Sequence, residues 1–364
     1  MSPVARVVGR EPARGRAALA AAGESWRVRY ASTSVTGAPT VVTGLVHLPA
    51  GEPSARGWPV VTYGHMTTGG SDRSAPSGAT DGHPELRRMT QGDHFVSHLL
   101  RAGIAVLQPD YEGLGSPGPH PYLIGPALAT SVRDLLVAAR ADDSRLSDQW
   151  VAAGHSEGAV AALFAAADGA PEGVTLRGCA AFTPVTRMDQ TIGASLLSPV
   201  VPPGFGVVPA LIALMISGAG TVDPVMAELI AGDGLSERAR ELWPQLEELT
   251  LTELAGRGSW GGLAPARIGG VRRHELRARL LASLRAGDVA HLRLPAGLPL
   301  RLDAALFDEV APYWLTRGLI DRYRAAGVRV EAHWWRSSHS GALTPRHAPE
   351  PAARWVARLF QGRG

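Results

Sequence analysis

Two stretches near the start of the chain alternate between apolar and polar residues. Residues 26–33 and 40–48 both show this two-residue period, which is typical of strands with one buried face. The segment between them, residues 34–39, is rich in the turn formers Ser, Thr, Gly and Pro. The pattern therefore predicts an antiparallel pair of strands.

Farther along the chain, short apolar runs replace this alternation. The runs occupy residues 59–63, 104–108, 150–153 and 176–182. Stretches with apolar residues at helical spacing separate them, most clearly residues 94–101, 127–141 and 157–167. Strands that alternate with helices predict an α/β fold with a doubly wound, mainly parallel sheet.

The strand–helix alternation stops at about residue 187 and resumes at about residue 296. Between these points the sequence predicts only helices and loops. After them it predicts strands at 298–302 and 328–335, and helices at 315–326 and 352–360. We therefore predict three parts: an N-terminal arm, a core in two segments, and a helical cap inserted into the core. The residues are 1–25 for the arm, 26–186 with 296–364 for the core, and 187–295 for the cap.

The composition fits a folded domain and excludes several classes of protein. The chain has 364 residues, of which 45% are apolar and 19% charged, so it can bury a large core. Its 36 basic residues, all of them arginine, nearly balance 33 acidic ones, and no nucleic-acid surface is indicated. Without lysine, the chain has no residue for a Schiff base or for a phosphate-loop lysine.

Cysteine content and hydrophobic segments bear on cellular location. Cys179 is the only cysteine, which excludes an intramolecular disulfide and leaves no cysteine zinc motif. The longest apolar stretch, residues 207–216, is too short to cross a bilayer, and residues 1–25 hold only a short apolar run. We expect a protein without a membrane segment that resides in the cytoplasm, with secretion as the second possibility.

Residues 154–158 form a Gly-x-Ser-x-Gly pentapeptide, Gly-His-Ser-Glu-Gly. It directly follows a predicted strand and precedes a helix of small residues, which is the setting of a nucleophile elbow. The flanking glycines are needed there because larger side chains would collide with the neighbouring strand and helix. Ser156 is thus the candidate nucleophile, and the alternative is an ordinary serine that caps the helix.

In enzymes with a nucleophile elbow, an acidic residue and then a histidine follow the nucleophile along the chain. Asp308 lies a few residues past the strand at 298–302, and we prefer it to Asp303, which belongs to the strand or its first turn. His339 follows the last predicted strand and is preferred to His333 and His347. His339 would remove the serine proton, while the aspartate would orient the imidazole and stabilise its charged form.

A negatively charged oxygen that forms during acyl transfer needs hydrogen-bond donors. The backbone N–H of Glu157, the residue after the nucleophile, is one candidate. The other should come from the loop at residues 64–70, where Met66 or Thr67 is the candidate donor. The same loop is also compatible with an ordinary surface turn.

These residues resemble the secretory lipases, a family of α/β hydrolases with a large helical cap. The most specific match is residues 109–125, Pro-Asp-Tyr-Glu-Gly-Leu-Gly-Ser-Pro-Gly-Pro-His-Pro-Tyr-Leu-Ile-Gly, and the resemblance extends over about 26–359. It implies an α/β-hydrolase fold and cleavage of acyl esters without a metal or an organic cofactor. We also expect His65, Tyr111 and His155 to contact the substrate.

Four departures from the family pattern stand out. Met66 follows His65 where the family has glycine, Glu157 replaces glutamine, residues 304–305 are both alanine, and Ser74 replaces cysteine. Met66 brings a bulky side chain to the oxyanion site, and Glu157 brings a carboxylate near the nucleophile.

We interpret the protein as a serine hydrolase acting on a hydrophobic ester, with the apolar stretch at residues 199–230 covering the site. The alternatives are an intracellular acyltransferase or biosynthetic tailoring enzyme that uses the same triad, and a catalytically idle protein that binds a hydrophobic ligand. The sequence does not indicate the oligomeric state.

Overall fold

The protein folds around a nine-stranded sheet in the computed structural model, which describes residues 5–362. The strands are β1 (Val7–Pro12), β2 (Glu24–Thr33), β3 (Pro39–Leu48), β4 (Trp58–Gly64), β5 (Ala105–Pro109), β6 (Leu146–His155), β7 (Thr175–Phe182), β8 (Pro299–Ala305) and β9 (Arg329–Trp335). Their order across the sheet is β1-β2-β3-β5-β4-β6-β7-β8-β9. The six strands β4 to β9 run parallel to one another, whereas β1, β2 and β3 pair antiparallel with their neighbours. The predicted mainly parallel sheet and its antiparallel pair are confirmed.

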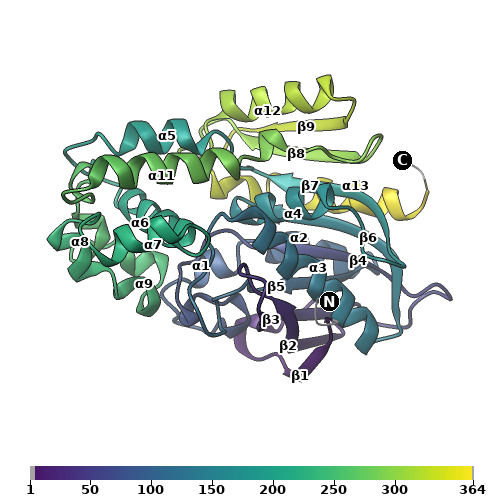
Figure 1. Cartoon of the computed structure of the whole chain (residues 1–364). Coiled ribbons are helices and arrows are strands. Elements are labelled where there is room, and N and C mark those ends of the chain that lie inside the picture. Colours follow the sequence, from purple (N-terminus) through teal and green to yellow (C-terminus); the bar gives the residue numbers. More distant parts are fainter. Residues whose placement is uncertain (1–4, 363–364) are drawn as a thin grey trace.

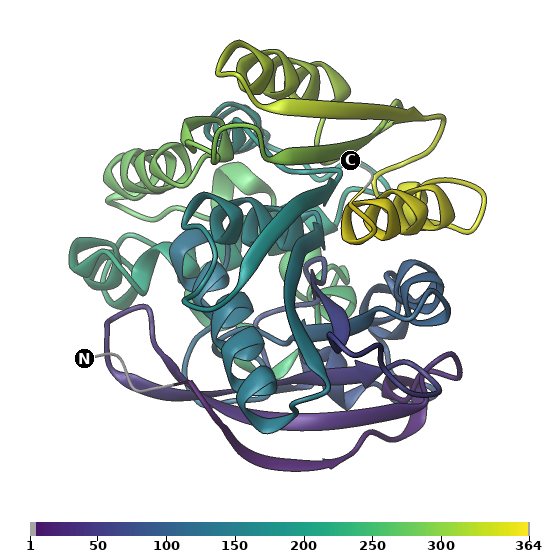
Figure 2. The same ribbon diagram turned by 90° about the vertical axis from the view of Figure 1, so that its right-hand side faces the viewer.

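Helices cover both faces of this twisted sheet (Figures 1 and 2). Side chains of α2 (Asp93–Arg101) and α13 (Pro349–Phe360) pack on one face. The other face is covered by α3 (Gly125–Asp142), α4 (Glu157–Ala167) and α12 (Tyr313–Ala325). This two-sided packing buries the central strands completely, which explains their continuous apolar sequences.

The first strand, β1, is an element that the sequence analysis did not predict. It pairs antiparallel with β2 at the edge of the sheet, within the stretch expected to be an arm. Its sequence, Val-Val-Gly-Arg-Glu-Pro, lacks the two-residue alternation because most of its side chains face solvent. Arg10 instead lies over the ring of Trp26 at 4.5 Å and pairs with Asp142 at 3.0 Å.

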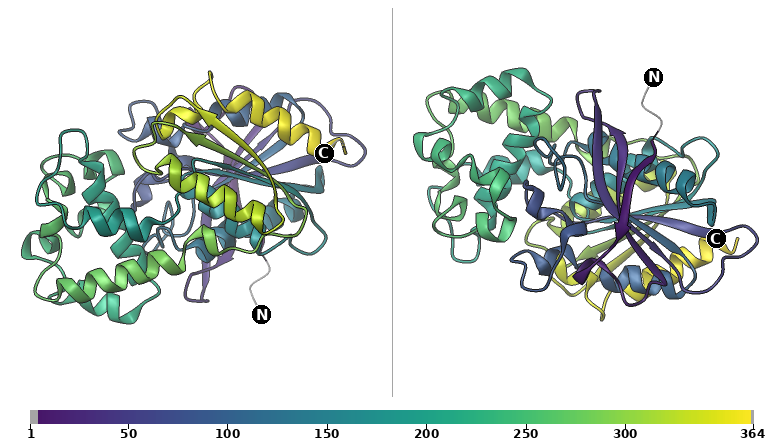
Figure 3. Two further views of the ribbon diagram at one scale, coloured as in Figure 1. Left: turned by 90° about the horizontal axis from the view of Figure 1, so that it is seen from above. Right: turned by 90° about the horizontal axis from the view of Figure 1, so that it is seen from below.

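Between β7 and β8 the described chain is helical, and we call residues 183–298 the helical insertion. Its helices are α5 (Met188–Ser195), α6 (Val207–Gly220), α7 (Pro224–Ala231), α8 (Glu237–Leu242), α9 (Gln245–Glu248), α10 (Leu251–Leu254) and α11 (Arg273–Ala286). They form a lobe beside the sheet, and the short helix α1 (Leu86–Met89) of the core lies near it (Figures 1 and 3). None of the described helices has the length and apolar character needed to span a membrane.

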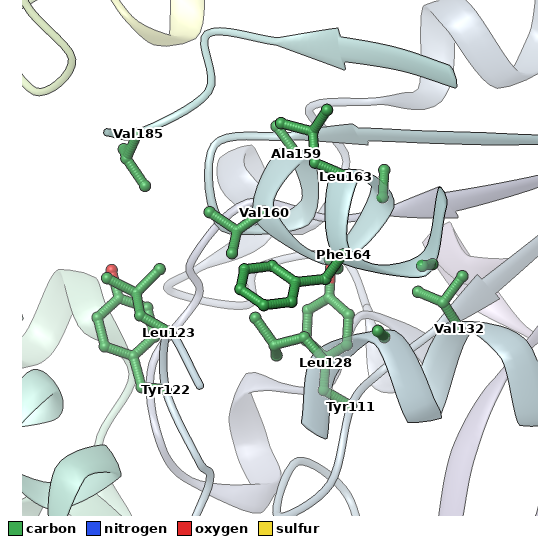
Figure 4. Close-up of a cluster of buried hydrophobic side chains, with 14 of the residues drawn as sticks. Tyr111, Tyr122, Leu123, Leu128, Val132, Ala159, Val160, Leu163, Phe164 and Val185 are labelled. Atoms are coloured by element: carbon green, nitrogen blue, oxygen red, sulfur yellow. The ribbon is translucent and has the colours of Figure 1, made fainter. Parts of the chain in front are cut away.

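Helix α3 packs closely against the second half of α4. Figure 4 shows the Phe164 ring of α4 next to Leu128 of α3, with Tyr111 beside them. At Gly125, the first residue of α3, an added Cβ would overlap the Phe164 ring, so the helix can approach only because it begins with glycine. The two helices thus form one packed layer on this face of the sheet.

Two buried histidines affect the stability of the fold in acid. His47 in β3 has no exposed surface, its Nδ1 lies 2.8 Å from Ser25 Oγ, and its Nε2 has no partner among the described residues. Burial lowers the pKa of His47 from 6.5 to about 4. Burial, with His339 nearby, lowers the pKa of His155 from 6.5 to about 3. Below its ordinary pKa, each histidine therefore binds a proton more readily in the unfolded chain.

The free energy of unfolding is expected to fall as the pH drops from about 6.5 to about 4, by up to about 1.4 kcal/mol per pH unit for each histidine. Urea unfolding at about pH 7 and about pH 4.5 measures this loss. His47→Asn keeps a partner for Ser25 Oγ but removes the titrating group, so its loss should be smaller. Equal losses in the wild type and the variant would contradict this explanation.

Candidate active site

The turn between β6 and α4 presents Ser156 in a strained backbone conformation. Ser156 has a φ of 57° and a ψ of −113°, in the region that side chains rarely adopt. A Cβ added at Gly154 would overlap the backbone of Gly158, and one added at Gly158 would overlap that of Gly64. Both flanking glycines are therefore required by space, as the pentapeptide predicted. The turn directs Ser156 Oγ toward the loop after β9.

Three of the predicted site residues form one hydrogen-bonded chain. Ser156 Oγ lies 2.8 Å from His339 Nε2, and both Asp308 carboxylate oxygens lie 2.9 Å from His339 Nδ1. A carboxylate can only accept, so the proton of a neutral imidazole sits on Nδ1 and is donated to Asp308. His339 Nε2 is then free to accept the Ser156 hydroxyl proton. Residues from three distant parts of the chain thus have the geometry of a nucleophile, a base and an orienting acid.

Asp308 is held in this position by its own loop. The backbone N–H groups of Val310 and Ala311 donate to its Oδ1 at 2.9 and 2.6 Å. The neighbouring Glu309 accepts the backbone N–H of His339 through Oε2 at 3.0 Å, which ties the two loops together. Such support fixes the carboxylate before any substrate arrives.

The residues that were ranked lower have other partners. Asp303 lies in β8, where it pairs with buried Arg301 at 2.7 Å and accepts the Trp335 indole N–H at 2.8 Å. His333 lies 2.8 Å from Glu331, and His347 contacts the carbonyl of Gly341. Within the described part of the chain, the side chains of these lower-ranked residues make no hydrogen bond to Ser156 or His339.

The candidate oxyanion donors lie beside the serine. Met66 and Thr67 line the same cavity as Ser156, and Glu157 is the first residue of α4. The backbone amides of these three residues have no acceptor within the described part of the chain. The loop is fixed by two contacts: Thr67 Oγ1 donates to the Tyr122 hydroxyl at 3.0 Å, and the His65 ring hydrogen-bonds the Met66 carbonyl at 2.7 Å. Unpartnered amides at a helix start are suited to bind a negative oxygen.

The three residues expected to contact the substrate, His65, Tyr111 and His155, do not line the cavity. All three are buried beneath it: Tyr111 donates to the His65 carbonyl at 3.0 Å, and the two rings stack at 4.5 Å. His155 Nε2 lies 3.3 Å from the carbonyl of His339. Burial lowers the pKa of both histidines and raises that of Tyr111. Their rings hydrogen-bond to the loops that carry Met66 and His339, so the expectation of direct substrate contact does not fit their positions.

A residue that the sequence analysis missed is His120, which pairs with Glu157. The imidazole Nε2 lies 2.8 Å from Glu157 Oε1, and both side chains are almost fully buried. His120 Nδ1 lies 2.8 Å from the carbonyl of Glu112, so this nitrogen carries a proton and donates it. Glu157 therefore does not face the nucleophile as expected but points back to the loop at residues 109–125. His120 itself lies within residues 109–125, the stretch that matches the family most specifically, and this position was the signal that could have found it.

Replacing Glu157 is expected to give different results for a polar and an apolar residue. Glu157→Gln keeps a hydrogen bond to His120, so kcat should change by no more than about tenfold. Glu157→Leu leaves Nε2 of buried His120 without a partner and should lower the free energy of unfolding by about 3 kcal/mol or more. Urea unfolding and ester turnover measure both effects. Equal stability of the two variants would show that the pair does not hold the start of α4.

A cavity of about 1250 Å³ opens above Ser156 and His339. The core contributes Met66, Thr67 and Tyr122, while most of the remaining wall comes from the helical insertion. That wall is largely apolar and includes Met188, Ile192, Pro199, Val200, Phe205, Val207, Val208 and Leu211. The cavity therefore has room for a long apolar chain next to the serine hydroxyl.

Within residues 5–362, no cluster of three or more His, Cys, Asp or Glu side chains is arranged to hold a metal ion. The hydrogen-bonded chain from Asp308 to Ser156 can activate a hydroxyl nucleophile by itself.

Comparison with known proteins agrees with the sequence resemblance. A family model described as secretory lipase matches residues 87–364, a range that includes Ser156, Asp308 and His339. No curated protein sequence matches the chain significantly.

Three solved structures show the fold to which the chain is similar. The closed state of Candida antarctica lipase A has a TM-score of 0.79 at 17% identity, over 98% of this chain and 82% of that one. A ligand-bound form of the rice cell wall degrading esterase LipA from Xanthomonas oryzae has a TM-score of 0.72 at 17% identity, over 100% and 99%. A putative hydrolase from Legionella pneumophila has a TM-score of 0.69 at 17% identity, over 100% and 98%. The predicted α/β-hydrolase architecture is confirmed.

Proposed function

Because the chain belongs to the secretory lipase family and acts on esters, we propose that it is a serine hydrolase that cleaves carboxylic esters through an acyl-enzyme intermediate. The observation that carries this proposal is the hydrogen-bonded chain from Asp308 through His339 to Ser156. It ends in the wall of an apolar cavity of about 1250 Å³.

In the proposed reaction, Ser156 Oγ attacks the ester carbonyl while its proton passes to His339 Nε2. The carbonyl oxygen becomes negative and accepts hydrogen bonds from the N–H of Glu157 and from that of Met66 or Thr67. Asp308 stabilises the imidazolium, which then protonates the departing alcohol and leaves the acyl group on Ser156. Water, deprotonated by the same imidazole, attacks the acyl carbon and releases the acid. The cycle restores the serine hydroxyl and the neutral histidine.

The helical insertion is proposed to act as a cap that selects the substrate. It supplies most of the apolar wall, and the segment before α6 contains the helix-breaking sequence Pro202-Pro203-Gly204. A hydrophobic acyl chain would bury apolar area against this wall. In this assignment the cap is residues 187–295, and the core is residues 26–186 with 296–364.

The proposal is tested by intact-mass labelling with a fluorophosphonate and by turnover of 4-nitrophenyl esters of increasing chain length. We expect one adduct on the wild type and release of free acid. An acyl group transferred to an added alcohol or amine instead of water would identify the acyltransferase alternative. Failure to label, with retained binding of a hydrophobic ester, would overturn the enzyme proposal in favour of the binding protein.

Cellular location is a separate question for experiment. The family description favours secretion, which the sequence analysis ranked second to the cytoplasm. Expression of the full gene in its native host, followed by assay of esterase activity in the medium and the cell lysate, decides between the two.

A further inference from the structure

The rim of the cavity carries an excess of positive charge. Its lining includes five arginines but, of the residues that the structure describes, only one with a carboxylate, Glu309. The whole chain is nearly balanced, with 36 basic and 33 acidic residues. The arginines are Arg87, Arg88, Arg238, Arg257 and Arg267. All are at least partly exposed, so they lie where the cavity meets solvent.

Three of the five guanidinium groups have no partner. Arg88 pairs with Glu85 and Arg238 with Glu241, each at 2.8 Å. By contrast, the side chains of Arg87, Arg257 and Arg267 make no ion pair or hydrogen bond with any described residue. The carboxylate of Glu309 is engaged by the backbone N–H of His339. The rim therefore offers cations that no described side chain neutralises.

These cations come from both sides of the cavity. Arg87 belongs to α1 of the core, whereas Arg257 and Arg267 follow α10 in the helical insertion. The insertion also supplies many apolar residues to the wall, Ile192, Val207 and Leu211 among them. The cavity thus combines an apolar interior with a cationic rim, and it is complementary to an amphiphilic anion.

We propose that Arg87, Arg257 and Arg267 form a subsite for an anionic group on the substrate. The substrate class is an amphiphilic ester whose apolar part contacts the insertion wall and whose carboxylate or phosphate meets the guanidinium groups at the rim. Guanidinium groups suit this role because their donors match the paired oxygens of carboxylates and phosphates. That the substrate is cleaved at an ester bond rests on the proposed function. The preference for an anionic substrate rests only on the arginines at the rim.

The test compares two esters that differ only at the far end of the acyl chain. One is 4-nitrophenyl octanoate, and the other is the mono-4-nitrophenyl ester of octanedioic acid, which ends in a carboxylate. Both are used as monomers at low ionic strength. We expect the ratio of kcat/KM, charged over neutral ester, to fall about tenfold in the triple variant Arg87→Gln, Arg257→Gln, Arg267→Gln. Added salt should lower the same ratio in the wild type.

A second triple variant controls for net charge. Arg29→Gln, Arg56→Gln and Arg346→Gln remove the same charge from exposed arginines that do not line the cavity, and the ratio should stay at the wild-type value. An equal fall in both triple variants, or no fall in the first, would overturn the subsite. A preference for the charged ester that appears only when anionic vesicles are added would also overturn the subsite. The arginines would then act by binding a lipid surface and not by binding the substrate.

Failure of the subsite can be distinguished from failure of the proposed function. Fluorophosphonate labelling of the same samples reports on Ser156 independently of charge. Binding of dodecyl phosphate relative to dodecanol, followed by calorimetry, reports on the rim without any turnover. We expect the wild type to prefer the phosphate and the first triple variant to lose most of that preference. Equal affinities for the two ligands in the wild type would overturn the subsite even if labelling succeeds.

Discussion

Replacing Ser156 with alanine is expected to lower kcat for 4-nitrophenyl esters by about 10⁴-fold or more and to abolish fluorophosphonate labelling. The reason is chemical, because His339 Nε2 then has no hydroxyl proton to accept and no atom can form the acyl-enzyme bond. The Ser156 side chain is small and its Oγ has its hydrogen bond only to His339 among the described residues. The free energy of unfolding should therefore change little, and urea unfolding measures it.

Ser195→Ala is the matched control for this variant. Ser195 also lines the cavity, but its Oγ donates to the Thr191 carbonyl within α5 at 2.9 Å. This variant should keep both labelling and turnover. If Ser156→Ala retained turnover, or if both variants lost it equally, the assignment of the nucleophile would be wrong.

Replacing Asp308 with asparagine is expected to lower kcat by about 10³- to 10⁴-fold at neutral pH. The carboxylate accepts the His339 Nδ1 proton at 2.9 Å, and an amide can instead present an N–H that favours the wrong tautomer. His339 Nε2 would then carry the proton and could not accept one from Ser156. The measurement is the dependence of kcat and kcat/KM on pH for an acyl ester.

Asp303→Asn supplies the contrast for this prediction. Asp303 is fully buried and pairs with Arg301, whose side chain is also buried. Removing its charge leaves Arg301 without a full partner and should lower the free energy of unfolding by about 3 kcal/mol or more. The molecules of this variant that remain folded should have the wild-type kcat. A larger loss of kcat in Asp303→Asn than in Asp308→Asn would show that the acid was assigned to the wrong residue.

The elements that the sequence predicted well are those with a strong local period. The central strands and the helices α2, α3 and α4 lie within a few residues of their expected positions, because burial on both faces or on one stripe leaves a clear apolar pattern. β1 was missed because an edge strand needs only backbone hydrogen bonds on one side and can keep charged side chains. An edge strand whose side chains face solvent, as in β1, therefore leaves only a weak hydrophobic pattern in the sequence.

The candidate site was predictable for a different reason. Ser156 sits in a motif whose glycines are required by the close approach of backbones, and such steric demands are visible in the sequence. His339 and Asp308 were found by their order after predicted strands. The structure brings all three within hydrogen-bond distance, and their catalytic roles stay a prediction until the variants are measured.

By itself the sequence determined the α/β class, the order of the strands along the chain and the position of the elbow serine, because each depends on residues close together in the chain. Only the tertiary structure decided the long-range contacts outside the predicted Ser156, His339 and Asp308 group. It paired Glu157 with His120, placed His65 and His155 beneath the cavity, and gathered unpartnered arginines at its rim. Such contacts join segments that are many residues apart, and their distances follow from how the sheet, the helices and the insertion pack, which no local pattern records.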